Sequence, residues 1–332
     1  DLTPRLPELV TLVLSNGWSS LSEGRERDRY QQDILPSYLP KARWFGAKGE
    51  PIEAFRSVAS GDLTSGGGSW LLTIAQAKLA SGERQRYFLP LAITWERPQE
   101  DIFTTNLMPF ALGRARKGPQ TGLIHDAFVD GGFVLSLIDA VREGRTIAAS
   151  PGEMRFVPTR AIENVTFDEV PEVRRLNVEQ SNTSVIIGDQ MVVKGYRRLE
   201  QGIHLELEVA RFLTEKAGFS NTPPLLGAVE HIGADGESTA LCIIQGFVRN
   251  QGSGWDFTLH HLERIYENEG ALRSDIDAGI PDLNQVYFVL AETLGVRTGE
   301  LHRAFALNTG DPAFDPEPVT VQDLRAWTEQ VR

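Results

Sequence analysis

Short apolar runs separated by glycine, proline and polar turns dominate the first 250 residues, and a helix-rich pattern follows after Trp255. The runs 69–75 and 86–94 are rich in β-forming residues and flank the polar turn Ser81-Gly82-Glu83, which predicts a hairpin. Together with the proline- and glycine-punctuated segment before them, they predict a small α+β unit over residues 1–98.

The middle of the chain alternates between helical and strand patterns. Residues 131–143 predict a helix and residues 154–157 a strand. The apolar runs 185–187 and 191–193 flank a Gly-Asp turn, which predicts a second hairpin. A helix over 201–217, a buried strand over 239–248, an amphipathic helix from Val286 to Phe305 and a helix over 321–331 complete the predicted elements.

Composition limits the class of protein and its partners. The chain of 332 residues is long enough for two or three domains, and 41% hydrophobic with 23% charged residues is typical of a soluble globular protein. A net charge of −12 without a basic patch argues against a nucleic-acid partner. No apolar run approaches the roughly 20 residues that span a bilayer, so no membrane contact is expected.

The single cysteine and the start of the chain add two expectations. Cys242 lies between Leu241 and Ile243, which predicts a buried, inert thiol in a reducing compartment, so a cytoplasmic location is expected. The chain starts at Asp1 without a methionine, and we expect it to be part of a larger polypeptide.

The stretch 179–184 carries the most informative candidate chemistry. Small hydroxyl and amide residues at a turn offer backbone N–H groups and side-chain donors to polyphosphate oxygens. A lysine on the adjacent strand adds a point charge for the same phosphates. The sequence therefore predicts a phosphate-binding turn and a strand lysine, made by Gln180, Ser181, Asn182, Thr183, Ser184 and Lys194.

Two further features extend this interpretation to a nucleotide. Glu208 lies on the apolar stripe of the predicted helix 201–217, where an acidic side chain needs a cation, and Lys194 is the nearest candidate. A solvated Glu208 is the alternative, with Glu206 as an equally good local partner for the lysine. The strand 239–248 ends at a glycine before a polar loop, which suits either an adenine-binding hinge or an ordinary strand end.

Several motifs, in order along the chain, resemble those of bacterial maltokinases and of the maltokinase part of trehalose synthase fusions. The opening signature is Leu-Pro-Ser-Tyr-Leu-Pro-Lys-Ala-Arg-Trp-Phe-Gly-Ala-Lys-Gly at residues 35–49. The other matching segments are 179–184, 197–203, 250–255 and 298–302.

This resemblance implies a protein-kinase-like bilobal fold with an N-terminal β-sheet cap, related to aminoglycoside phosphotransferases. The implied domains are a cap over 1–98, an intermediate and nucleotide-binding lobe over 99–250, and the start of a helical lobe over 251–332. The family transfers the γ-phosphoryl group of ATP, with Mg²⁺, to the anomeric hydroxyl of maltose and produces maltose 1-phosphate.

The resemblance also implies residue roles. Gln180 to Ser184 correspond to the phosphate loop, Lys194 to the phosphate-positioning lysine and Glu208 to its helix partner. The adenine hinge corresponds to Gln245, Gly246, Phe247 and Val248. The signature around Trp44 corresponds to the cap, where we expect Trp44 to pack on the cap sheet with Arg43 stacked or paired.

One departure from the family affects catalysis. The family's catalytic His-Gly-Asp segment and its metal-binding Asp-Phe segment follow the helix that matches 294–305, and no histidine of this chain precedes Gly-Asp. We therefore expect no catalytic base or metal ligand in this chain, both lying downstream of Arg332, an incomplete helical lobe, and no useful activity of the segment alone. The alternatives are a non-catalytic module of a trehalose synthase fusion, or a kinase for another sugar such as glucosamine.

Overall fold

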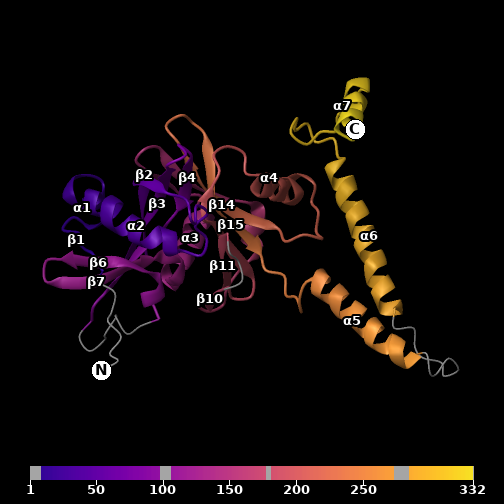
Figure 1. The fold of residues 1–332 in the computed structure, drawn as a ribbon, viewed down its shortest axis with the longest axis horizontal. Helices are drawn as coiled ribbons and strands as arrows, with labels where there is room; N and C mark the ends of the chain where they lie inside the picture. Colours follow the sequence, from indigo (N-terminus) through magenta and orange to yellow (C-terminus); the bar gives the residue numbers. More distant parts are fainter. Residues whose placement is uncertain (1–8, 98–105, 177–180, 273–283, 332) are drawn as a thin grey trace. The chain divides into compact units, whose positions relative to one another are not determined.

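The structure is a computed structural model that describes residues 9–97, 106–176, 181–272 and 284–331. Two mainly antiparallel sheets precede a series of helices, which confirms the α+β class (Figure 1). The chain divides into two compact units, residues 1–211 with 224–247 and residues 212–223 with 248–332. Both sheets belong to the first unit.

The first sheet contains the predicted hairpin of the cap. Its strand order is β1-β6-β7-β5-β3-β4-β13, and β2 pairs with β3 outside that path. Only the β1–β6 pairing among the described strands is parallel. The strands are β1 Thr11–Val13, β2 Ile52–Ser65, β3 Gly68–Leu79, β4 Arg84–Phe88, β5 Leu91–Trp95, β6 Ala111–Lys117, β7 Gln120–Asp126 and β13 Arg198–Leu199.

This sheet continues past the expected domain boundary at residue 98. The strands β6 and β7 pair with each other, and β7 pairs with β5, so the strands on both sides of residue 98 belong to one sheet. The predicted strand 86–94 is divided between β4 and β5, because Pro90 cannot donate a ladder hydrogen bond.

Short helical segments cover one side of the cap sheet and contribute to its core. They are η1 Gly17–Leu21, α1 Gly24–Arg29, η2 Tyr30–Ile34, α2 Leu35–Tyr38 and η3 Leu39–Lys41. Ile34, Leu35 and Leu39 are fully buried and join a cluster that also contains Trp44 and Tyr87. The predicted packing of Trp44 within the cap is confirmed, whereas Arg43 is exposed.

The second sheet carries the predicted nucleotide residues. Its order is β10-β11-β12-β15-β14-β9-β8, and every described pairing is antiparallel. The strands are β8 Thr146–Ala148, β9 Glu153–Pro158, β10 Val173–Arg175, β11 Asn182–Ile187, β12 Met191–Tyr196, β14 Leu225–Ile232 and β15 Ser238–Gly246. The predicted hairpin over 185–193 and the buried strand near Cys242 are confirmed.

Helix α3, Gly131–Arg142, packs against β9 and β14 of this sheet. Asp130 caps the helix by accepting a hydrogen bond from the N–H of Gly132 at 2.9 Å, and it also accepts one from Trp70 Nε1 at 2.7 Å. Helix α4, Leu205–Arg211, contacts β14. The short segments η5 Met108–Phe110 and η7 Arg160–Asn164 lie between strands, and η6 Ala127–Val129 connects β7 to α3.

A buried arginine joins the two sheets. Arg197 is 0% exposed, and its guanidinium donates to Asp126 Oδ2 at the end of β7 and to Thr183 Oγ1 on β11, at 2.5 and 2.7 Å. The rings of Trp44 and Phe128 lie 4.9 and 4.6 Å from its guanidinium carbon. Arg197, rather than Arg43, is therefore the arginine that stacks on Trp44.

The second unit is helical. It contains η8 Phe212–Lys216, α5 Gly254–Leu272, α6 Gln285–Phe305 and α7 Val321–Val331. The rings of Phe212, Phe305 and Phe314 stack on one another, with Phe212 and Phe314 4.0 Å apart. His261 stacks on Tyr287 at 4.4 Å, which brings α5 and α6 together.

Candidate functional site

The register of the second sheet places the predicted phosphate residues beside the predicted lysine. Ser184 of β11 lies opposite Lys194 of β12, and Lys194 lies opposite Ile243 of β15. Residues directly opposite each other in a sheet project from the same face. Ser184 and Lys194 therefore share one face, on a strand with neighbours on both sides.

Helix α4 supplies the acidic partner of this lysine. Lys194 Nζ lies 3.0 Å from both carboxylate oxygens of Glu206, and the Tyr196 hydroxyl donates to Glu206 Oε2 at 3.0 Å. The Lys194 side chain is 22% exposed and that of Glu206 39%. The carboxylate thus holds the partly desolvated ammonium group in place, and the phenol in turn holds the carboxylate.

The predicted partner Glu208 is therefore wrong, and the alternative Glu206 is correct. The helix begins at Leu205 instead of Gln201, and its first turn contains both Glu206 and Glu208. Residues two apart on a helix point in different directions, so Glu208 does not face the lysine when Glu206 does. Leu207 and Ala210 form the buried side of the helix.

His204 and Tyr196 belong to the same cluster and were missed in the sequence. Their rings lie 4.1 Å apart, and burial lowers the pKa of His204 below its ordinary value, opposed by the nearby charge of Glu206. Tyr196 lies two residues after Lys194 on one strand, so the period-2 alternation of a strand is the signal that points to it.

The predicted phosphate turn divides between the two faces of β11. Gln180 lies outside the described residues, and Ser181 is exposed. Asn182 and Ser184 alternate onto the Lys194 face, as the prediction requires. The side chain of Thr183 faces the other way, because its hydroxyl accepts the hydrogen bond from Arg197.

The predicted hinge lies where the chain leaves the first unit. The division between the two units falls between Phe247 and Val248, next to Gln245 at the end of β15. The N–H of Gly246 donates to Pro224 O at 2.9 Å, and that of Phe247 donates to Gln190 O at 2.8 Å. These bonds fix the strand end and engage both N–H groups.

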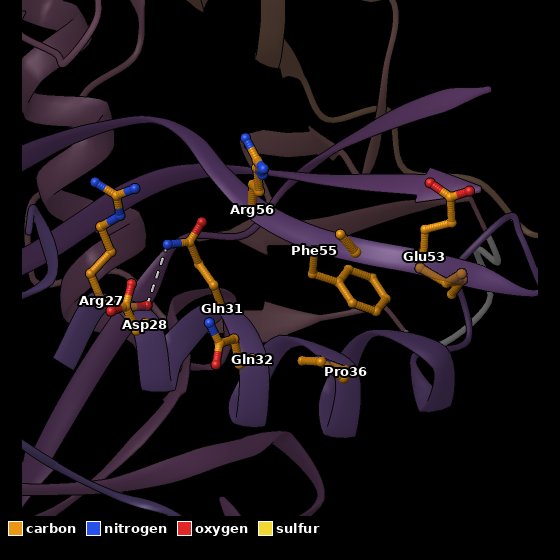
Figure 2. Close-up of a pocket in the computed structure, with 10 residues that line it drawn as sticks. Arg27, Asp28, Gln31, Gln32, Pro36, Glu53, Phe55 and Arg56 are labelled. Carbon is orange, nitrogen blue, oxygen red and sulfur yellow. Dashed lines mark hydrogen bonds between the residues drawn. The ribbon is translucent and has the colours of Figure 1, made fainter. Parts of the chain in front are cut away.

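A separate cavity of about 590 Å³ lies in the cap, between the helical segments 27–36 and the start of β2 (Figure 2). Arg27, Asp28 and Gln31 line its helical side, and Phe55 and Arg56 line the strand side. Gln31 closes part of it by accepting a hydrogen bond from the N–H of Ser57 at 3.2 Å. Among the predicted nucleotide residues that the structure describes, none lines this cavity.

The described residues contain neither a metal-binding cluster nor a membrane-spanning helix. No group of three or more histidine, cysteine, aspartate or glutamate side chains is gathered closely enough there to hold a metal ion. None of the described helices combines the length and apolarity needed to cross a bilayer.

Comparison with known proteins supports a kinase-like chain. Residues 38–130 match the family model of the maltokinase N-terminal cap domain. Glucosamine kinase of Mycolicibacterium smegmatis (strain ATCC 700084 / mc(2)155) is 28% identical over 156 residues, which cover 47% of this chain and 34% of that protein.

The fold matches solved structures of glucosamine kinase. One of them, in complex with glucosamine, ADP and inorganic phosphate, gives a TM-score of 0.54 at 19% identity and covers 95% of this chain and 57% of that one. A second crystal form gives the same TM-score at 20% identity. The chain thus has the α+β, kinase-like fold with an N-terminal cap, and it spans between a third and three fifths of these relatives.

Proposed function

We propose that this chain is the cap and nucleotide-binding part of an ATP-dependent sugar kinase. The observation that carries the proposal is the Lys194–Glu206 pair on an interior strand, with Ser184 beside the lysine on the same face. The matches to a maltokinase cap and to glucosamine kinases support the same class.

In the proposed mechanism, Lys194 neutralises phosphate oxygens of ATP and Glu206 holds the lysine in position. A sugar hydroxyl attacks the γ-phosphorus as its proton passes to a general base, the bond to the bridging oxygen breaks, and ADP leaves. Asn182 and Ser184 lie on the face where they would contact the phosphates, and the end of β15 at Gln245 to Phe247 would border the adenine. Mg²⁺ would supply charge neutralisation when bound. The described residues gather no ligand set for it.

Maltose is the proposed sugar, with maltose 1-phosphate as product, because the cap domain matches that of maltokinases. Glucosamine is the second candidate, because the matched curated protein and solved structures are glucosamine kinases. An association with trehalose synthase is part of the maltokinase proposal and rests on the resemblance of the sequence motifs to those of trehalose synthase fusions. We further propose that the 332-residue chain transfers phosphate poorly by itself, since it covers 57% of the matched kinase structure.

Nucleotide binding tests the site directly. We expect Lys194→Ala to weaken ATP binding by roughly 10- to 100-fold in calorimetric titration, because hydrogen bonds to charged groups contribute about 1.5–3 kcal/mol. Lys78→Ala is the matched control, since Lys78 also pairs with a glutamate, Glu53, at 2.5 Å, but on the cap sheet. Equal ATP affinity in both variants would contradict the assignment of Lys194.

The glutamate assignment and the sugar need separate experiments. Glu206→Gln should weaken ATP binding more than Glu208→Gln, because only Glu206 of the two contacts the lysine.

Phosphoryl transfer to maltose, glucosamine and glucose, assayed with the longest natural polypeptide that contains this chain, identifies the acceptor. Transfer to glucosamine but not maltose would replace the first candidate with the second.

A further inference from the structure

The strands that carry Ser184 and Lys194 have a second face, which is held by the cap. Thr183 lies opposite Gly195 in the same β11–β12 pairing. Because side chains alternate along a strand, this pair projects away from the proposed phosphate site. Whatever fixes Thr183 and Gly195 also fixes their immediate neighbours, Ser184 and Lys194.

Gly195 lets a cap aromatic ring lie directly on β12. A Cβ atom at this position would lie 2.3 Å from the tip of the Phe128 ring, closer than any real contact allows. Phe128 immediately follows the cap sheet, and its N–H donates to Asp126 Oδ1 at 3.0 Å. The ring and the Asp126 carboxylate are thus positioned together by one short turn.

Arg197 completes the connection from the cap to the phosphate strand. Its Nε donates to Thr183 Oγ1 at 2.7 Å, and its terminal nitrogens donate to Asp126 Oδ2 and to the carbonyl of Phe88 at 2.5 and 3.3 Å. Both charged side chains are at most 1% exposed, and every side of the guanidinium has a defined contact.

A buried ion pair contributes little net stability compared with an apolar pair of similar volume, but its hydrogen bonds have defined directions. Here the hydrogen bonds of Arg197 connect the cap sheet to Thr183, which lies one residue before Ser184. The cap residues involved, Trp44, Phe88, Asp126 and Phe128, all lie within the segment 38–130 that matches the maltokinase cap domain.

We propose that Asp126 and Arg197 are positioning residues through which the cap holds the phosphate-binding strand in register, with Thr183 as the point of attachment. This inference rests on the proposed nucleotide site. It assigns to the cap a role in nucleotide affinity, exerted through β11 rather than through contact with the nucleotide.

Thr183→Val tests the proposal with little change in volume, because it removes the hydroxyl that accepts from Arg197. We expect ATP affinity to fall about 5- to 10-fold, consistent with the loss of one charge-assisted hydrogen bond. Amide hydrogen exchange at residues 182–187 should become faster, while exchange along β14 stays at the wild-type rate. Thr183→Ser keeps the hydroxyl and should restore both measurements to within about twofold of wild type.

Thr239→Val is the matched control, a buried threonine at the far end of β15 in the same sheet. It should leave ATP affinity and β11 exchange unchanged. If the wild-type chain binds no ATP, the proposed function fails for this chain, and the exchange measurement still decides whether Thr183 anchors β11. Wild-type exchange at β11 in Thr183→Val, or equally faster exchange across the whole sheet, would overturn the positioning role.

Discussion

The two compact units use similar amphipathic patterns but bury them to different extents. In the first unit, the apolar side chains of α3 and of both sheets are enclosed in two core clusters. In the second, α5 and α6 expose large apolar side chains, among them Trp255 at 70%, Tyr266 at 83% and Leu294 at 68%.

This difference shows that an amphipathic helix can form without its apolar side chains being buried in a core. A local pattern suffices to predict a helix, whereas the stability of that helix depends on what covers its apolar stripe. Within the described residues, the first unit supplies that cover for α3, and the second unit leaves much of α5 and α6 uncovered. We therefore expect substitutions in the first unit to affect stability far more than equivalent ones in the second.

The largest effect is expected at the buried ion pair of the first unit. Arg197→Met removes the cation and leaves Asp126 buried without its ion-pair partner, which should cost about 3–5 kcal/mol of unfolding free energy. The double variant Arg197→Met with Asp126→Leu removes both charges and should recover much of that loss. Urea unfolding of the three proteins measures both effects, and a single variant as stable as wild type would show that Asp126 finds another partner.

A matched pair of leucines sharpens the comparison of the two units. Leu137 of α3 is fully buried, so Leu137→Ala should cost about 2–5 kcal/mol. Leu294→Ala, at the exposed position on α6, should cost no more than about 0.5 kcal/mol. Similar losses at the two positions would mean that Leu294 is covered in solution, and would remove the contrast between the units.

The reactivity of the Cys242 thiol reports the difference between the two leucine variants. It is the only cysteine of the chain and lies fully buried on β15, where burial raises the pKa of its thiol to about 12. A protonated, enclosed thiol reacts only when the sheet opens. Leu137→Ala should therefore accelerate alkylation of Cys242 by at least about 10-fold under native conditions, and Leu294→Ala should not.

The sequence predicted those parts of the first unit that depend on neighbouring residues. Strand alternation and turn chemistry predict the hairpin around Gly188, and helical periodicity predicts the helix over 131–143. Both elements are confirmed. The predicted strand 86–94 is not continuous: its two parts on either side of Pro90 both pair with β3, but β4 also pairs with β13 and β5 with β7.

The parts that were missed depend on contacts between distant residues. Asp126 and Arg197 are 71 positions apart, and no local pattern indicates that either is buried. Likewise, Lys194 was correctly assigned to an interior strand, but the choice between Glu206 and Glu208 depended on which side of α4 faces β12, a contact between distant elements.

The smallest predicted effect concerns His204, at the proposed site of the first unit. Its folded-state pKa lies below the ordinary value of 6.5, because burial beside Tyr196 disfavours the charged imidazolium. The unfolded chain therefore binds more protons near and below that value, so stability falls as the pH decreases through the unfolded pKa. The neighbouring carboxylates of Glu200 and Glu206 oppose the shift and limit its size.

His204→Phe keeps a ring against Tyr196 and removes the titrating group. Between about pH 7.5 and pH 5.5, the wild-type protein should lose more unfolding free energy than this variant, as measured by urea titration at each pH. Taking the difference between the two proteins cancels the titration of all other groups. Parallel pH profiles would show that His204 is hydrated in the folded state and that its imidazole does not lie enclosed between Tyr196 and the start of α4.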